Sequence, residues 1–145
     1  MSYFDSSYIA KFYLDEPESE AVREVAEALG QVQCSSIGQV EVAAVFHRKR
    51  REGAFGASAY REVTAQFADD CALGLWTWLP VTGALLEKTA AAFTRLASPV
   101  FLRAVDALHL VSAREHGLRE VYTNDRHMLS AARRFQLRPM TVRRP

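Results

Sequence analysis

Short β-strand patterns that alternate with helical patterns restrict the fold of this chain more than any other feature of its sequence. Runs rich in β-branched and aromatic residues recur along the chain, and apolar residues at helical spacing fill the stretches between them. This alternation favours a parallel sheet covered by helices on both faces. We therefore predict an α/β fold with three layers, α/β/α, and a central parallel sheet of about five strands. The predicted strands are residues 2–5, 32–35, 77–81, 120–124 and 137–142.

Seven helices are predicted around these strands, and glycine marks the end of several of them. Gly30, Gly53 and Gly117 each follow an apolar periodic segment, as expected of residues at helix C-termini. Pro139 is tolerable in the last predicted strand only if that strand lies at an edge of the sheet. The predicted helices are residues 6–14, 18–29, 37–51, about 57–75, 82–97, about 102–116 and 125–135.

Length and composition are those of an ordinary globular protein. The 145 residues suit one domain, which we expect to span residues 1–145, and the net charge of +1 gives no overall field that would indicate nucleic acid. No apolar run approaches the length of a membrane span, and the first residues lack the pattern of a signal peptide. Cys34 and Cys71 have no metal-ligand spacing, so two reduced thiols and a cytoplasmic location are expected.

An acidic residue stands in an otherwise apolar helical segment, LRAVDALHLVSA, residues 102–113. The polar residues of this segment, Arg103, Asp106, His109 and Ser112, recur at every third position and form a polar stripe that can line a wet cleft. An unpaired buried carboxylate costs several kcal/mol or becomes protonated, so Asp106 needs a partner, a cavity or a cation. Glu41 is similarly isolated in IGQVEVAAVF, residues 37–46.

Two further acidic residues follow predicted strands. Asp5 ends the first strand, and Asp125 comes directly after the fourth, in the sequence TND. In doubly wound sheets, ligands bind beyond the carboxyl ends of the strands, where the strand order reverses. If the first and fourth strands are neighbours at that reversal, Asp5 and Asp125 face each other across the crevice.

Each of these acids also has an ordinary interpretation. Asp5 and Asp125 could be helix N-caps, Glu41 could pair with an arginine, and Asp106 could pair with Arg103 or His109. Together, however, they form a set of carboxylates with no basic residue in an equivalent place, and such a set is stabilised by a hard divalent cation. Mg²⁺ held in this way lowers the pKa of a bound water and stabilises charge on a phosphate, which suits phosphodiester hydrolysis.

The segments that carry these acids resemble a known family. YFDSSYIAKFY, SSIGQVEVAAVF, LRAVDALHLVSA and VYTNDRHMLSAA, taken in order, look like a PIN-domain protein, and more narrowly a VapC-type toxin of bacterial toxin–antitoxin pairs. The resemblance covers almost the whole chain. It implies Mg²⁺- or Mn²⁺-dependent cleavage of RNA, a homodimer, and an antitoxin partner that occupies or distorts the site. It assigns the catalytic and metal-binding acids to Asp5, Glu41, Asp106 and Asp125.

Other functions remain as alternatives. A PIN-type nuclease outside a toxin–antitoxin system would carry the same acids. A phosphatase with Asp5 as nucleophile would be expected to carry Asp-x-Asp, whereas the chain has DSS. A phospho-acceptor module would need an acid after the third strand and a lysine after the fifth, and the chain provides neither. A binding protein with an inactive site is disfavoured because all four acids are present.

Basic residues gather at two places. HRKRR, residues 47–51, lies at a predicted helix C-terminus, where it could complement the helix dipole or contact RNA phosphates. The same two interpretations apply to the arginines near the C-terminus, which are Arg133, Arg134, Arg138, Arg143 and Arg144.

Overall fold

The structure is a computed structural model that describes residues 1–143, so Arg144 lies outside the described residues. The strands are short and lie between helices. The strands are β1 (Ser2–Phe4), β2 (Val32–Ser35), β3 (Trp76–Leu79), β4 (Glu120–Tyr122) and β5 (Arg138–Met140). The helices are α1 (Ser6–Tyr13), α2 (Ser19–Leu29), α3 (Ile37–Arg51), α4 (Ala57–Ala72), α5 (Gly83–Arg95), α6 (Ala104–Glu115) and α7 (Arg126–Ala131), followed by a 3-10 turn, η1 (Ala132–Phe135).

All strand pairs are parallel, and the strand order is β3-β2-β1-β4-β5. The chain moves outward from β1 through β2 to β3, and then crosses back to β4 on the other side of β1. Strand β1 is therefore central and pairs with both β2 and β4, with Phe4 opposite Tyr122. The order reverses between β1 and β4, which is the arrangement in which Asp5 and Asp125 are expected to face each other.

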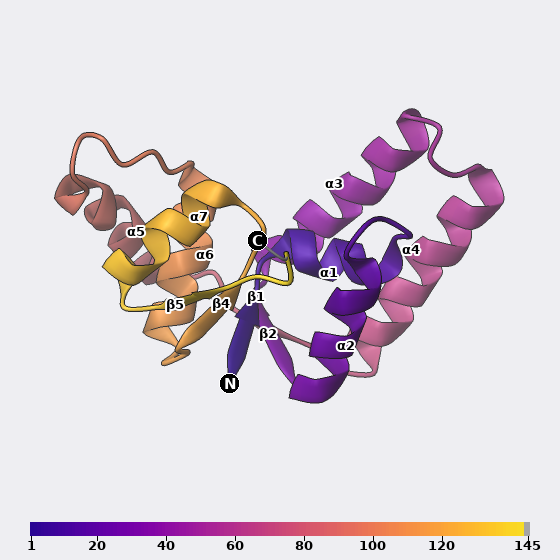
Figure 1. Cartoon of the computed structure of the whole chain (residues 1–145), viewed down its shortest axis with the longest axis horizontal. Helices are drawn as coiled ribbons and strands as arrows, with labels where there is room; N and C mark the ends of the chain where they lie inside the picture. The colour runs from indigo at the N-terminus through magenta and orange to yellow at the C-terminus, as the bar shows by residue number, and fades with distance from the viewer. Residues whose placement is uncertain (144–145) are drawn as a thin grey trace.

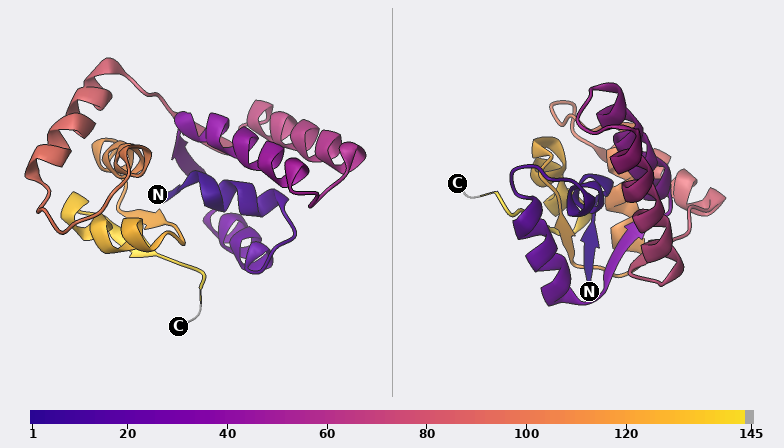
Figure 2. Two further views of the ribbon diagram at one scale, coloured as in Figure 1. Left: turned by 90° about the horizontal axis from the view of Figure 1, so that it is seen from above. Right: turned by 90° about the vertical axis from the view of Figure 1, so that its right-hand side faces the viewer.

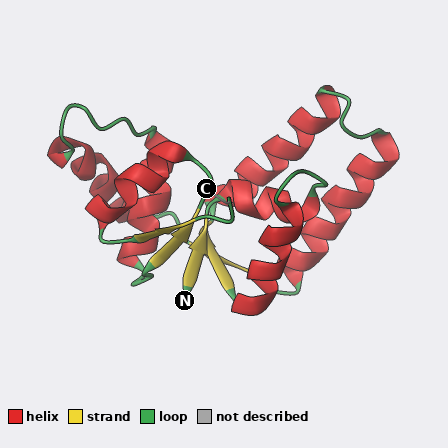
Figure 3. Cartoon of the chain, viewed as in Figure 1, coloured by secondary structure: helices red, strands yellow, loops and turns green. Residues whose placement is uncertain are grey.

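Helices cover both faces of this sheet. Helices α1 to α4 lie on one side, and α5 to α7 lie on the other (Figure 1). The strands are enclosed between these two helical layers (Figure 3). The predicted three-layer α/β/α fold with a five-stranded parallel sheet is confirmed. Among the described residues, no helix is long and apolar enough to cross a bilayer.

Side chains of β1 connect the sheet to both helical layers. Phe4 packs edge-on against Tyr8 of α1, while Tyr3 contacts His109 of α6, and all three aromatic side chains are fully buried. Gly38 lets the start of α3 approach the sheet closely, because a Cβ there would lie 2.6 Å from Cys34 Sγ. These contacts fix α1, α3 and α6 against the central strands.

Most predicted element boundaries agree with the structure, and the differences have local causes. Residues 32–35 and 37–51 form a strand and a helix as predicted. The fourth helix ends at Ala72 rather than near residue 75, because Gly74 with φ of 75° and the following strand stop it. The last predicted helix tightens into a 3-10 turn from Ala132. Strand β5 lies at the sheet edge, as Pro139 requires.

Helices α3 and α4 form an antiparallel pair that extends beyond the end of the sheet (Figures 1 and 2). Glu41 lies in an apolar segment of α3, but the apolar residues beside it are not all buried. Val40 is highly exposed, and Ala43 and Ala44 are exposed as well. Apolar residues therefore lie on the exposed face of α3 as well as on its buried face.

Candidate functional site

One pocket beyond the carboxyl ends of the strands brings together all four acids singled out in the sequence. Asp5, Glu41, Asp106 and Asp125 line this pocket, which has a volume of about 530 Å³. Asp5 follows β1 and Asp125 begins the helix after β4, while Glu41 and Asp106 project from α3 and α6. We call this cavity the acidic pocket. The four residues are far apart in sequence and meet only through the sheet topology.

Asp5 is the most deeply placed of the four acids, with 4% of its surface exposed. It caps α1, because its Oδ1 accepts hydrogen bonds from the Tyr8 backbone N–H at 3.1 Å and from the Ser7 hydroxyl at 2.5 Å. The Thr123 hydroxyl donates to its other oxygen. Burial raises the pKa of Asp5, and these hydrogen bonds oppose that rise only in part. A nearby positive charge would therefore favour the ionised form.

Asp106 and Asp125 share one arginine. Arg103 Nε donates to Asp106 Oδ2 at 2.7 Å, and Arg103 Nη2 donates to Asp125 Oδ2 at 3.0 Å. The other oxygen of Asp125 caps α7 by accepting from the backbone N–H groups of His127 and Met128. The Arg103 side chain is 62% exposed, so it can leave these carboxylates without opening the core.

Glu41 belongs to a chain of hydrogen bonds that runs into the core. Glu41 Oε1 lies 2.5 Å from His109 Nε2, and His109 Nδ1 lies 2.5 Å from the Tyr3 hydroxyl. The Tyr3 oxygen also accepts from the backbone N–H of Ser35. This chain holds the Glu41 carboxyl group toward the pocket from β1, β2 and α6.

The charge on His109 depends on its surroundings. Burial opposes protonation of this residue, but its hydrogen bond with the Glu41 carboxylate favours the protonated form, and the pKa of His109 is raised. Burial also raises the pKa of the Cys34 thiol, which is therefore neutral near pH 7. Glu41 is thus the acidic partner of His109, and a protonated His109 donates to both Glu41 and Tyr3.

The donor chemistry of the acidic pocket suits a hard cation, since four carboxylates supply oxygen ligands. As the side chains stand, however, no three His, Cys, Asp or Glu residues within residues 1–143 are grouped closely enough to hold one ion. The cause is that each carboxylate already has a partner in the protein. A cation would replace Arg103 between Asp106 and Asp125, and would compete with His109 for Glu41.

The structure also differs from the expected polar stripe on α6. Arg103, Asp106 and His109 line the acidic pocket, but Ser112 is fully buried, and its hydroxyl has no hydrogen-bond partner among the described residues. The step of three residues drifts around the helix, so the fourth member turns into the core. Residues of the polar stripe therefore line the acidic pocket over only two turns of the helix.

Sequence reasoning missed three features of this site. It did not identify Ser7 as a partner of Asp5, although DSS places a hydroxyl two residues after the acid. It considered Arg103 as a partner of Asp106 but not of Asp125, and nothing in the sequence indicates that bridge. Tyr3 was placed in a strand without a role, although strand alternation shows that it faces away from Phe4.

The basic segment 47–51 is divided between two environments. His47, Arg48 and Arg51 line the acidic pocket. Lys49 instead pairs with Glu16, and the Arg50 guanidinium lies over the Tyr60 ring, 4.9 Å from its centroid. The part of this segment that faces the pocket carries cations toward the four acids.

The fold and this pocket define an α/β protein with a carboxylate-lined site at the point where the strand order reverses. Comparison with protein families identifies the class further, because the PIN domain family model matches residues 2–134. The chain belongs to the PIN domain family, as its sequence predicted. No curated protein sequence matches the chain significantly.

Solved structures with the same fold support this assignment. VapC20 of Mycobacterium tuberculosis, described as a toxin that cleaves the sarcin–ricin loop, superposes with a TM-score of 0.70 at 18% identity, over 90% of this chain and 95% of VapC20. FitAcB from Neisseria gonorrhoeae gives 0.67 at 20% identity, over 97% and 96% of the two chains. A toxin–antitoxin complex from Klebsiella pneumoniae gives 0.62 at 19% identity, over 90% and 91%.

Proposed function

We propose that residues 1–145 form one PIN domain that acts as a metal-dependent endoribonuclease, the toxin of a type II toxin–antitoxin pair. The observation that carries this proposal is the meeting of Asp5, Glu41, Asp106 and Asp125 in one pocket of a PIN-family chain. The fold that it shares with VapC20, whose description names RNA-cleaving toxin activity, supports the choice of substrate.

The four carboxylates are proposed to hold Mg²⁺ or Mn²⁺, as the donor set favours. When bound, such a cation supplies a water of lowered pKa and neutralises charge on the phosphate that is cleaved. The chain's own residues prepare this site. Thr123 and Ser7 orient Asp5, and His109 orients Glu41. Arg103 neutralises Asp106 and Asp125 until a cation replaces it.

RNA is proposed to enter past the basic side of the acidic pocket. Arg48 and Arg51 line this pocket from α3, and both are exposed. Guanidinium groups recognise phosphates through paired N–H donors, so they suit contacts on either side of the scissile bond. This arrangement favours the RNA-contact interpretation of 47–51 for these two residues.

Partners follow from the same assignment. The proposed partners are a cognate antitoxin and a second copy of the chain in a cytoplasmic homodimer. The toxin–antitoxin description of a structure with the same fold supports the antitoxin.

RNA cleavage by the purified protein tests the activity. Wild-type protein is expected to cleave RNA with Mg²⁺ or Mn²⁺ and to stop when a chelator is added. Asp106→Asn should lose this activity while its unfolding transition stays intact, and Asp69→Asn, on the exposed face of α4, is the matched control. Equal cleavage by Asp106→Asn and wild type would overturn the site assignment.

Growth after induction separates the toxin from a PIN nuclease of another role. Expression of wild type, but not of Asp106→Asn, should arrest growth, and a small co-encoded protein should relieve the arrest. Normal growth at a high yield of active nuclease would reject the toxin role and leave the nuclease chemistry.

A further inference from the structure

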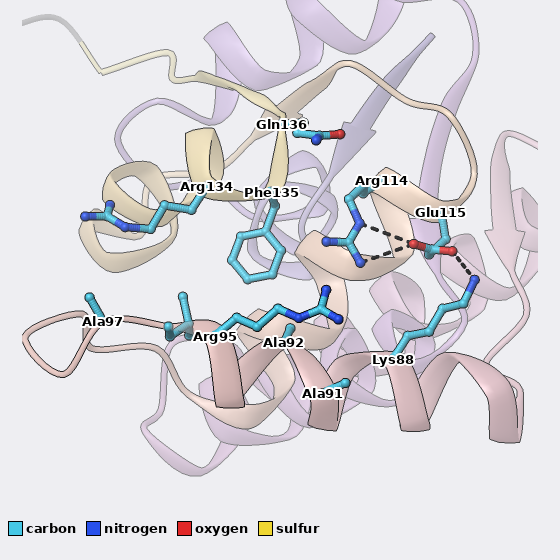
Figure 4. A pocket seen from close by; sticks show the side chains of 11 residues that line it. Lys88, Ala91, Ala92, Arg95, Ala97, Arg114, Glu115, Arg134, Phe135 and Gln136 are labelled. Atoms are coloured by element: carbon cyan, nitrogen blue, oxygen red, sulfur yellow. Dashed lines mark hydrogen bonds and ion pairs between the residues drawn. The ribbon is translucent and has the colours of Figure 1, made fainter.

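A second pocket, larger than the acidic one, lies on the other side of α6. It has a volume of about 640 Å³ and is formed by α5, the end of α6 and the turn η1. Its lining includes four cationic side chains, Lys88, Arg95, Arg114 and Arg134, and a single carboxylate, that of Glu115. We call it the basic pocket (Figure 4).

Both oxygens of the Glu115 carboxylate are paired with cationic side chains. Glu115 accepts from Arg114 Nη2 at 3.1 Å on one oxygen, and its other oxygen pairs with Lys88. The figure shows Glu115 between these two cations (Figure 4). One negative charge is therefore shared by two positive groups, and it cannot neutralise the rest of the pocket.

Arg95 and Arg134 are left without an acidic partner. Within residues 1–143, neither side chain forms an ion pair. The Arg95 side chain extends along the pocket past Phe135 toward the Arg114 side, and Arg134 marks the opposite end (Figure 4). Like charges gathered in a concave surface repel one another unless an anion joins them.

Other groups hold the pocket in a form ready to bind. The Arg114 guanidinium lies 5.9 Å from the centroid of the Phe135 ring, so it is fixed by that ring as well as by Glu115. Gln136 has a φ of 62°, a left-handed conformation that glycine would adopt more easily, and its side chain also lines the pocket.

We propose that the basic pocket binds a backbone phosphate of the RNA outside the cleaved bond. This inference rests on the proposed nuclease function and deepens it. A polyanionic substrate supplies the charge that the pocket lacks, and Arg95 and Arg134, at opposite ends of the pocket, can each donate paired N–H groups to a phosphate (Figure 4). The segment from residue 96 to 102 connects Arg95 of this pocket to Arg103 of the acidic pocket along the chain.

Binding of RNA by a cleavage-impaired protein tests the proposal. The probe is a fluorescently labelled single-stranded RNA of about 20 nucleotides, and its affinity for Asp106→Asn is measured by anisotropy over a series of KCl concentrations. Adding Arg95→Glu should weaken binding about tenfold and lower the slope of log K against log salt by about 0.7, the value for one lost phosphate contact with a single strand. Arg134→Glu should act in the same direction.

The matched control is Arg61→Glu, which makes the same charge change on exposed α4, outside both pockets. It should change affinity by less than about twofold, because its charge is screened from a distant RNA. Thermal unfolding confirms that each variant is folded. Equal losses for Arg95→Glu and Arg61→Glu would overturn the phosphate site.

Cleavage by the wild type, measured in parallel, distinguishes this inference from the function on which it rests. If the wild type cleaves RNA and Arg95→Glu binds RNA like the control, the basic pocket is rejected and the nuclease stands. If the wild type neither binds nor cleaves RNA, both proposals are rejected.

Discussion

The acidic pocket and the basic pocket lie on opposite sides of α6 and differ in how their charges are balanced. In the acidic pocket, four carboxylates meet Arg103 and His109, and every carboxylate has a partner in the chain. In the basic pocket, Glu115 pairs with Lys88 and Arg114, and Arg95 and Arg134 have no acidic partner among the described residues. Cations of the chain itself balance charge in the acidic pocket, whereas the basic pocket stays positive until it binds an external anion.

Chemistry and substrate capture should therefore separate between the two pockets. Asp106→Asn removes a carboxylate proposed to hold the cation, so we expect kcat to fall at least about a hundredfold. Arg95→Glu should leave kcat within about twofold and raise KM, because it removes binding away from the reacting bond. Steady-state cleavage of one labelled RNA by both variants measures this contrast, and a drop in kcat for Arg95→Glu would break it.

The two pockets should also differ in how they affect the pH dependence of stability. His109 has a raised pKa, so the folded chain holds its proton above the ordinary value of about 6.5. Its stabilising effect is complete below that pH and is lost as pH rises through the raised pKa of His109. We expect the free energy of unfolding to fall by at least about 1 kcal/mol over this range.

Glu41→Gln removes the acidic partner of His109 and should flatten this dependence, and Glu62→Gln on α4 should not. Urea unfolding at a series of pH values measures it. If the free energy of unfolding of Glu41→Gln depends on pH as that of the wild type does, the Glu41–His109 pair does not cause the loss of stability at alkaline pH.

Removing the Arg103 guanidinium from the acidic pocket should make the difference between the two pockets larger. Arg103→Ala frees Asp106 and Asp125, so an incoming cation no longer displaces a guanidinium. Exposed ion pairs contribute up to about 1 kcal/mol, so we expect Mn²⁺ to bind up to about fivefold more tightly. Calorimetric titration measures the change, with Arg61→Ala as the control. Weaker Mn²⁺ binding would show that Arg103 supports the site instead of blocking it.

The smallest expected effect concerns the deepest acid. The raised pKa of Asp5 means that its ionised form destabilises the cation-free fold, increasingly as pH rises above the ordinary range for aspartate. Asp5→Asn should therefore raise the free energy of unfolding at neutral pH by about 0.5 to 1 kcal/mol, measured in urea with a chelator present. Arg95→Glu, on the surface, should change it by less than about 0.5 kcal/mol. A clear loss of stability in Asp5→Asn would contradict the inference that ionised Asp5 destabilises the cation-free fold.

Much of the fold could be predicted because its causes are local. Glycines and periodic apolar residues set the limits of α2 and α3, and Pro139 indicated an edge strand. The four acids were found because each is unusual in its own segment. Whether they meet depended on the pairing of β1 with β4, which short segments do not encode.

The features that escaped prediction are tertiary. The bridge from Arg103 to Asp125 joins residues that are close only after α6 and β4 are in place. The basic pocket draws Arg95, Arg114 and Arg134 from three elements, and the sequence offered only Arg134, as part of a C-terminal group. In that group, Arg138 and Arg143 instead pair with Glu120 and Glu18.

The central position of β1 has a consequence for synthesis of the chain. Thr123, which donates a hydrogen bond to Asp5, and Asp125, which lines the same pocket, are synthesised more than a hundred residues after Asp5. A nascent or prematurely terminated chain thus cannot assemble the pocket. An enzyme that attacks RNA would therefore remain harmless to the ribosome and message producing it until residues 123–125 have been synthesised.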